Sequence, residues 1–123
     1  MNKKSVVIVA AKRTALGSFQ GQFSSLSASD LGSYAISSAI EDSHIEPTQV
    51  DSVHMGCVLP AGQGQAPARQ ASLKAGLPLS VPCNTVNKMC GSGMQAVMYG
   101  SNQIFAGDAN CVVAGGMESM TNA

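Results

Sequence analysis

The stretch 85–97, TVNKMCGSGMQAV, holds a cysteine, Cys90, followed by the pair of glycines Gly91 and Gly93. A short strand is expected before Cys90 and a helix after it, which places the thiol beside free backbone N–H groups and the positive end of the helix dipole. Both favour the thiolate, so the pKa of Cys90 is expected to fall below the usual value of about 8.5. The glycines leave room for an acyl group, and the Cys90 N–H is available to an oxyanion. The pattern therefore favours a nucleophile for acyl transfer.

Two other interpretations of these residues stay open. A structural cysteine is common at a junction between a strand and a helix. Residues 91–96, GSGMQA, also fit the dinucleotide-binding pattern G-x-G-x-x-A, which requires an acid about 20 residues later, at the end of the next strand. Asp108 precedes that expected strand and Glu118 lies beyond it, so the match is weak. The other glycine pair, Gly62 and Gly64, is followed by a proline at the third position and fails.

A cysteine nucleophile in acyl transfer usually works with a base, most often a histidine. The chain has two histidines, His44 and His54. His44 is expected to end the first helix, and His54 to lie on the polar face of a strand, so a structural role is favoured for both. Lys88, two residues before Cys90, would support a thiolate, although a solvated lysine fits the pattern equally well. The sequence therefore offers a nucleophile without a convincing base.

Composition argues against several classes of function. Seven basic and seven acidic residues cancel, so the chain lacks the basic surface expected of a nucleic-acid-binding protein. No apolar run approaches the roughly 20 residues of a membrane span, and the one that follows Lys3 and Lys4 is too short for a secretory signal. We therefore expect a cytoplasmic protein with reduced cysteines. The four cysteines form no C-x-x-C pair, so no metal site is expected.

Short β-branched runs alternate with helical patterns along the chain, which is typical of an α/β fold with a largely parallel sheet. The predicted strands are 5–10, 50–59, 83–87 and 111–114. The predicted helices are one that begins at the capping box of Ser27 and Asp30, 68–75 ended by Gly76, and 91–106 closed by Gly107. The last of these helices contains no charged residue, which predicts that protein covers it on most sides. The chain itself has little left to supply that cover.

The motifs NKMCGSGMQAV (87–97) and VVAGGMESM (112–120) closely resemble those of the thiolases, in particular the biosynthetic acetoacetyl-CoA type. The resemblance begins near the N-terminus with RTALGSFQGQF and SASDLG and continues through VLPAGQGQAPARQASLKAGLP, in the order that the family shows. Several separate motifs at matching spacing make a chance match implausible.

The resemblance implies that Cys90 accepts an acetyl group from acetyl-CoA, and that a second acetyl-CoA then condenses with it to give acetoacetyl-CoA, or the reverse. It implies a five-layered αβαβα sandwich of two similar halves, with the nucleophile at the start of a buried helix. It also implies fatty acid metabolism, a homo-oligomer (dimer or tetramer), and coenzyme A thioesters as substrates, with no separate cofactor or metal. Glu118 lies in a family motif, and we assign it a structural role only.

The family pattern continues beyond Ala123, so residues 1–123 are expected to be a partial thiolase N-terminal domain in a truncated chain. The family's catalytic histidine, second cysteine, water-positioning asparagine and coenzyme A-binding loops match no residue here. We therefore expect the isolated chain to be inactive. A non-catalytic assembly fragment is the main alternative, and a dinucleotide-binding module is a weaker one.

Overall fold

Helices and strands alternate along the computed structural model, which describes residues 5–123. The helices are α1 (Ala28–Ser43), α2 (Pro67–Lys74) and α3 (Ser92–Phe105), with a short 3-10 helix at Pro47–Gln49; the strands are β1 (Ser52–Gly56), β2 (Cys83–Val86) and β3 (Val112–Gly116). The strands form one parallel sheet in the order β2-β1-β3. The predicted α/β class and the parallel sheet are confirmed.

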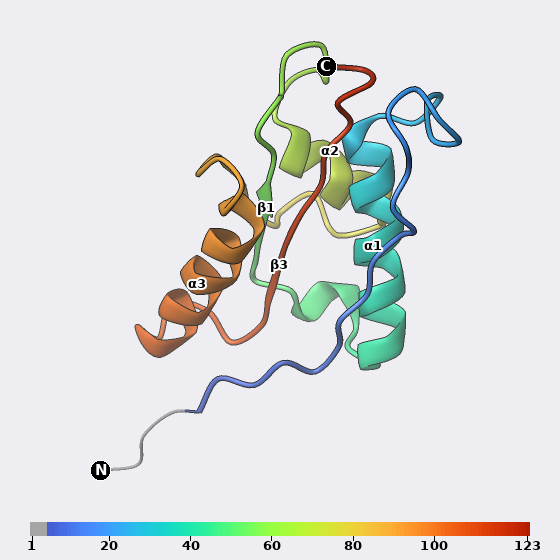
Figure 1. The fold of residues 1–123 in the computed structure, drawn as a ribbon. Helices are drawn as coiled ribbons and strands as arrows, with labels where there is room; N and C mark the ends of the chain where they lie inside the picture. The colour runs from blue at the N-terminus through green and yellow to red at the C-terminus, as the bar shows by residue number, and fades with distance from the viewer. Residues whose placement is uncertain (1–4) are drawn as a thin grey trace.

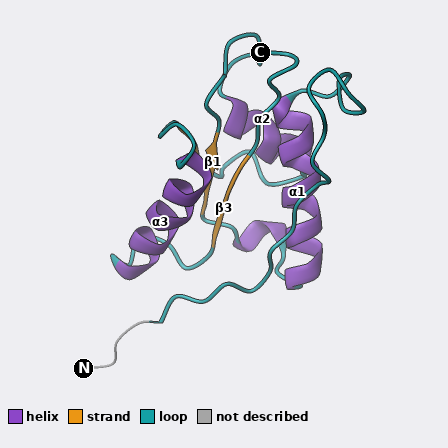
Figure 2. Ribbon diagram, in the orientation of Figure 1, coloured by secondary structure: helices purple, strands orange, loops and turns teal. Residues whose placement is uncertain are grey.

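The helices cover both faces of this sheet. The connection through α2 leads from β1 to its neighbour on one side, β2, whereas the connection through α3 leads back across β1 to β3. Because such crossovers are right-handed, the opposite directions of movement place α2 and α3 on opposite faces. Figure 1 shows α1 and α2 together on one face and α3 alone on the other, and Figure 2 shows the strands between them.

The start of α1 forms the capping box that the sequence predicts. The Ser27 hydroxyl accepts a hydrogen bond from the Asp30 N–H at 3.1 Å, and the Asp30 carboxylate accepts one from the Ser27 N–H at 2.9 Å. Lys74, the last residue of α2, lies 2.6 Å from the same carboxylate. Its hydrogen bond is the main reason that the pKa of Asp30 falls to about 2. The ends of α2 and α3 are also as predicted, because Gly76 and Gly107 follow them with left-handed backbones.

The hydrophobic core lies between the sheet and the pair α1/α2. Val53 and Met55 of β1, and Cys57 directly after it, belong to this core and are almost fully buried. The alternate residues Ser52 and His54 were predicted to form a polar face, yet all five residues of β1 are buried. The alternation is confirmed, but α3 covers the second face, so that face does not contact solvent.

The predicted strand at 5–10 is wrong for the described structure. This segment runs along the outside of the molecule, and Val7, Ile8 and Val9 are each at least 60% exposed. A strand needs hydrogen bonds from a neighbouring strand, and within residues 5–123 neither edge of the sheet pairs with this segment. The apolar pattern alone therefore could not decide the secondary structure here.

Within residues 5–123 only one side of α3 is covered, in line with the expectation that this chain has little left to cover the other side. Ala96 and Gly100 pack against the sheet, and a Cβ at Gly100 would lie only 2.9 Å from the side chain of Val112. The opposite side of the helix, which we call the α3 outer face, is exposed: Met94, Val97, Met98, Tyr99 and Phe105. No helix in the described part of the chain has both the length and the apolar character needed to cross a membrane.

Candidate active site

Cys90 lies in a tight turn between β2 and α3, and it is exposed. Helix α3 begins at Ser92 with Gly91 as its N-cap, so the thiol-bearing residue directly precedes the cap. The prediction of a cysteine at a strand–helix junction is confirmed. The role of Cys90 as a nucleophile remains a prediction.

The residue before the cysteine, Met89, has a left-handed backbone with a φ of 48°. For a residue with a side chain this conformation costs about 1–2 kcal/mol, so surrounding contacts must hold it in place. Ser92 supplies several of them: its hydroxyl donates to the Met89 carbonyl at 2.6 Å and accepts from the Lys88 N–H at 2.9 Å. The Ser92 N–H also donates to the Met89 carbonyl at 3.1 Å, so the turn is closed by its own hydrogen bonds.

The first turn of α3 offers backbone donors near the thiol. The first hydrogen bond of the helix runs from the Gln95 N–H to the Gly91 carbonyl at 2.8 Å. Among residues 5–123 no acceptor pairs with the N–H groups of Gly93 and Met94, as is usual at a helix start. These donors and the helix dipole favour an anion at this end of α3.

Two glycines let α3 approach the sheet closely at this point. A Cβ at Gly56, the last residue of β1, would lie 2.6 Å from the carbonyl carbon of Ser92 and 2.7 Å from the nitrogen of Gly93. A Cβ at Gly116, the last residue of β3, would lie 3.3 Å from the Cα of Gly93. The start of α3 therefore lies directly against the carboxyl ends of β1 and β3, the edge at which parallel sheets usually bind ligands.

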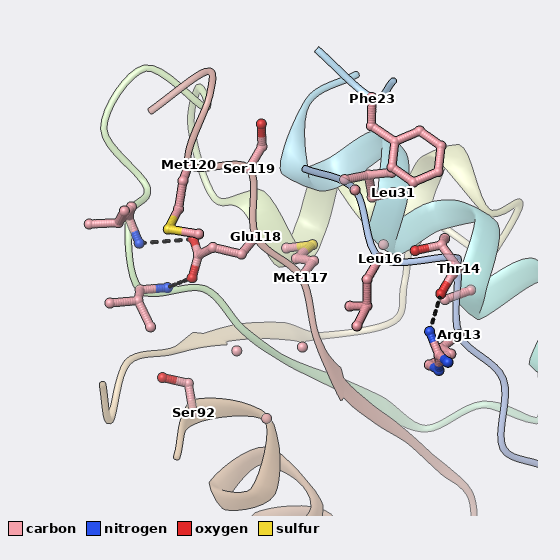
Figure 3. Close-up of a pocket in the computed structure, with 18 of the residues that line it drawn as sticks. Arg13, Thr14, Leu16, Phe23, Leu31, Ser92, Met117, Glu118, Ser119 and Met120 are labelled. Carbon is pink, nitrogen blue, oxygen red and sulfur yellow. Dashed lines mark hydrogen bonds between the residues drawn. The ribbon is translucent and has the colours of Figure 1, made fainter. Parts of the chain in front are cut away.

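A cavity of about 660 Å³ opens beside this helix start. Its walls are residues 12–19, part of α1, the segment after β1, the start of α3 and residues 116–121. Figure 3 shows Ser92 on one side of the cavity and Leu16 and Phe23 on the other. Met89 and Cys90 line the cavity beside the start of α3, so Cys90 borders the cavity at that end.

Glu118 also lines the cavity, and it makes backbone contacts. Its carboxylate accepts hydrogen bonds from the N–H groups of Val58 at 2.8 Å and Leu59 at 3.0 Å, which Figure 3 draws as dashed lines. The Cys57 thiol donates to the same carboxylate at 3.5 Å. Burial first, and then the Glu118 charge, raise the pKa of Cys57 to about 11. These contacts agree with the structural role that the sequence suggested for Glu118.

Neither histidine is placed to act on Cys90. His44 is the C-cap of α1, with a φ of 57°, as predicted. His54 is buried under α3, where Asn84 Nδ2 lies 3.3 Å from its Nδ1 and Gln103 Oε1 lies 2.9 Å from its Nε2. The amide can only donate to Nδ1, so Nε2 carries the proton and donates to Gln103. Gln103 is eleven residues beyond Ser92, about 16 Å further along the helix.

The remaining candidates have other partners. The Lys88 ammonium donates to the side chain of Gln95 at 3.0 Å, so the structure gives no support to a contact between that ammonium and the thiol. The dinucleotide interpretation lacks its acid, because Asp108 precedes β3 and the Glu118 carboxylate is engaged by Val58 and Leu59. Within residues 5–123 no three His, Cys, Asp or Glu side chains come together as metal ligands.

Sequence reasoning missed two features of this site. The left-handed backbone of Met89 has no local signal, because non-glycine residues rarely adopt it. Asn87 was read only as the end of a strand, yet its side chain accepts from the Met89 N–H at 3.1 Å and donates to the Val58 carbonyl at 3.2 Å. An asparagine two residues before an unusual backbone is a known turn-forming pattern and was the available signal.

Comparisons with known proteins agree with this geometry. A family model described as the thiolase N-terminal domain matches residues 6–123. An acetyl-CoA acetyltransferase of Cupriavidus necator is 55% identical over 118 residues, which cover 96% of this chain and 30% of that protein. A mitochondrial acetyl-CoA acetyltransferase of Homo sapiens is 55% identical over 119 residues, 97% of this chain and 28% of that protein.

The fold is also shared with a solved structure. A thiolase of Ascaris suum, crystallised in complex with coenzyme A, superposes with a TM-score of 0.92 at 42% identity. The match covers 94% of this chain and 30% of that one. The chain thus spans about 30% of the length of the relatives it matches.

Proposed function

The chain belongs to the thiolase family, and on that premise we propose that it supplies the nucleophilic cysteine, Cys90, of an acetyl-CoA C-acetyltransferase. The observation that carries the proposal is the exposed thiol at the start of α3, on the wall of a cavity at the carboxyl ends of the strands. The relatives named acetyl-CoA acetyltransferase and the coenzyme A complex of a similar thiolase support the substrate class.

The proposed reaction has two transfers. The Cys90 thiolate attacks the carbonyl carbon of acetyl-CoA; the bond from that carbon to the coenzyme A sulfur breaks, and coenzyme A leaves as its thiolate. The product is an acetyl thioester on Cys90. A second acetyl-CoA then loses a methyl proton to a base, and its carbanion attacks the thioester carbon. Acetoacetyl-CoA forms and the Cys90 thiolate is released, and the reverse sequence cleaves acetoacetyl-CoA.

The described residues would serve the first transfer. The start of α3 would stabilise the thiolate through its dipole and free N–H groups, and the Cys90 N–H would donate to the oxyanion of the tetrahedral intermediate. Gly91 faces open space, since a Cβ there would meet only the Lys88 carbonyl oxygen, at 3.5 Å. That space would admit the acetyl group.

The second transfer needs a base that residues 5–123 do not place near the thiol. His44 caps α1 and His54 is buried in its own hydrogen-bonded cluster. We assign the base and the main coenzyme A contacts to regions of the thiolase length that this chain does not span. The 123 residues alone should therefore show no thiolysis of acetoacetyl-CoA, and turnover by the purified chain would refute this.

We propose further that the protein acts as a homo-oligomer in the cytoplasm, in fatty acid metabolism, with no bound cofactor. The exposed apolar residues of the α3 outer face support an assembly, because such a surface is unfavourable in water. The free thiols at Cys57, Cys83, Cys90 and Cys111 support a reducing compartment. Cell fractionation would decide between the cytoplasm and the mitochondrion, which the name of the human relative gives as its location.

The main experiment uses an extended protein, in which this chain is followed by the remainder of the Cupriavidus necator acetyl-CoA acetyltransferase. Cys90→Ser should lower thiolysis of acetoacetyl-CoA by about 1000-fold or more, because a serine hydroxyl is a much weaker nucleophile than a thiolate. The acetylated form should carry its acetyl group on Cys90 by mass spectrometry. The control is Cys111→Ser, half-buried at the opposite end of the sheet, which should keep normal activity.

Retention of activity within about tenfold in Cys90→Ser would refute the assignment. The dinucleotide alternative predicts saturable binding of NAD to the chain, and we expect none. The assembly alternative predicts that Cys90→Ser has no effect on any activity of the extended protein, whereas substitutions on the α3 outer face do.

A further inference from the structure

The hydrogen bonds from Ser92 do not by themselves account for the left-handed backbone of Met89. Ser92 holds the Met89 carbonyl, but the Met89 N–H is bound from outside the helix, by Asn87 Oδ1 at 3.1 Å. A left-handed backbone at a residue with a side chain persists only when its surroundings fix it from more than one direction. Because Met89 directly precedes Cys90, whatever fixes Met89 also sets the direction of the thiol.

The side chain of Asn87 is held in place by the segment that follows the neighbouring strand, β1. Its Nδ2 donates to the Val58 carbonyl at 3.2 Å, so one side chain joins the segment after β1 to the turn after β2. The two bonds use the opposite ends of one amide group, with Oδ1 as the acceptor and Nδ2 as the donor. No shorter or longer side chain offers this pair of groups at the same spacing.

The segment after β1 is in turn held by hydrogen bonds to a residue that follows β3. The carboxylate of Glu118 accepts the N–H groups of Val58 and Leu59, at 2.8 and 3.0 Å. Val58 therefore has its N–H bound by Glu118 and its carbonyl bound by Asn87. A continuous hydrogen-bonded series runs from Glu118 through Val58 and Asn87 to Met89, and it joins the segments that follow all three strands.

We propose that Asn87, anchored through Val58 by Glu118, is a positioning residue that holds Met89 in its left-handed conformation and so presents the Cys90 thiol to substrate. Asn87 does not touch the reacting atoms and acts only through Met89. This inference rests on the proposed function of Cys90 and adds to it the group that sets the direction of the nucleophile.

The test measures kcat and KM for thiolysis in the extended protein. Asn87→Ala should lower kcat by about tenfold to 100-fold with KM within about twofold, since a displaced nucleophile slows the chemistry more than it weakens substrate binding. Asn87→Asp keeps the acceptor for the Met89 N–H and loses the donor to the Val58 carbonyl. Its kcat should therefore lie between the kcat of the parent and that of Asn87→Ala. The control Asn110→Ala, an exposed asparagine before β3, should match the parent.

A second substitution distinguishes positioning from a general loss of stability. Glycine adopts a left-handed backbone without steric cost, so Met89→Gly should remove the need for Asn87. In the Met89→Gly background, Asn87→Ala should lower kcat by less than about threefold. Equal losses in both backgrounds would overturn the proposal, as would a normal kcat for Asn87→Ala. If Asn87→Ala does not fold, the loss of kcat caused by Asn87→Asp is compared between the parent and the Met89→Gly background, and equal losses again overturn the proposal.

Failure of this inference differs from failure of the proposed function. If Cys90→Ser remains active, the proposed function is wrong whatever Asn87 does. If Cys90→Ser is inactive and Asn87→Ala is fully active, only the positioning role of Asn87 is wrong.

Discussion

Gly56→Ala should move the start of α3 and thereby displace Cys90. The added Cβ would lie 2.6 Å from the Ser92 carbonyl carbon and 2.7 Å from the Gly93 nitrogen, whereas ordinary contacts begin at 3.4 Å. The shortfall is about 0.8 Å, and the obstructing atoms are backbone, which cannot rotate away as a flexible side chain can. The helix start must therefore shift by a comparable distance away from the end of β1.

Two magnitudes follow from that shift. Overpacking of this kind costs about 1–3 kcal/mol of folding free energy, which urea unfolding of the 123-residue chain would measure. A nucleophile misplaced by about 1 Å can lose about 100-fold in rate, so kcat for thiolysis by the extended protein should fall by that order. KM should change much less, because the displaced group acts in the chemical step.

The matched control is Gly115→Ala, on β3 beside the same edge of the sheet. A Cβ at Gly115 would meet only the flexible side chain of Met55, at 3.4 Å, so the cost should stay below about 1 kcal/mol with kcat near normal. If Gly56→Ala and Gly115→Ala have the same kcat, the close approach of α3 to β1 does not set the position of Cys90, and the reasoning fails.

Three further predictions concern stability, thiol reactivity and association. Asp30→Asn should lower the free energy of unfolding by about 1 kcal/mol at pH 7, a value reduced for the solvent screening of a carboxylate that is about one-third exposed. Since folding lowers the pKa of Asp30 from 3.8 to about 2, its contribution is full well above pH 3.8 and is lost as the pH falls through 2, which urea unfolding at pH 7 and at pH 2 would show. Iodoacetamide at pH 8 should modify Cys90 quickly and leave Cys57 unmodified, because burial and Glu118 raise the pKa of Cys57 to about 11; mass spectrometry with fragmentation would locate the label. Met94→Lys, which places a charge on the α3 outer face, should reduce self-association of the chain, as measured by analytical ultracentrifugation.

Each of these predictions has an outcome that contradicts it. For Asp30, an equal stability loss at pH 2 and pH 7 would exclude the carboxylate as the source. For the thiols, equal labelling of Cys57 and Cys90 in the folded chain would mean that the core at β1 opens readily. For the association, the control is Lys12→Glu, which lies outside the α3 outer face. Equal self-association of Met94→Lys and Lys12→Glu would show that the chain does not associate through the α3 outer face.

The elements whose signals are local could be predicted from the sequence. The capping box of Ser27 and Asp30 fixed the start of α1, because both partners lie within one helical turn. Gly76 and Gly107 marked the ends of α2 and α3, because a left-handed residue after a helix favours glycine. Apolar alternation placed β1, and the short runs between helical patterns placed β2 and β3, each to within a few residues. The family resemblance was confirmed by the match over residues 6–123.

The features that depend on distant partners could not be predicted in this way. The apolar segment 5–10 has the composition of a strand, but only a neighbouring strand could have made it one. His54 follows a polar alternation, and only the packing of α3 shows that Asn84 and Gln103 bind both of its ring nitrogens. The bonds of Val58 to Asn87 and Glu118 span 29 and 60 residues, beyond the reach of any local pattern.

The glycines around Cys90 illustrate how one residue type serves two physical purposes at the same site. Sequence reasoning assigned Gly91 and Gly93 the same role, that of leaving space for an acyl group. In the structure a Cβ at Gly91 would find mostly open space, whereas Gly93 lies against Gly116 and the end of β1, where even a Cβ on Gly56 would collide with it. Gly91 therefore leaves space for the acyl group of the substrate, whereas Gly56, Gly93 and Gly116 set the distance between α3 and the sheet. That distance, together with the Asn87 contact to Met89, determines where the thiol of Cys90 points.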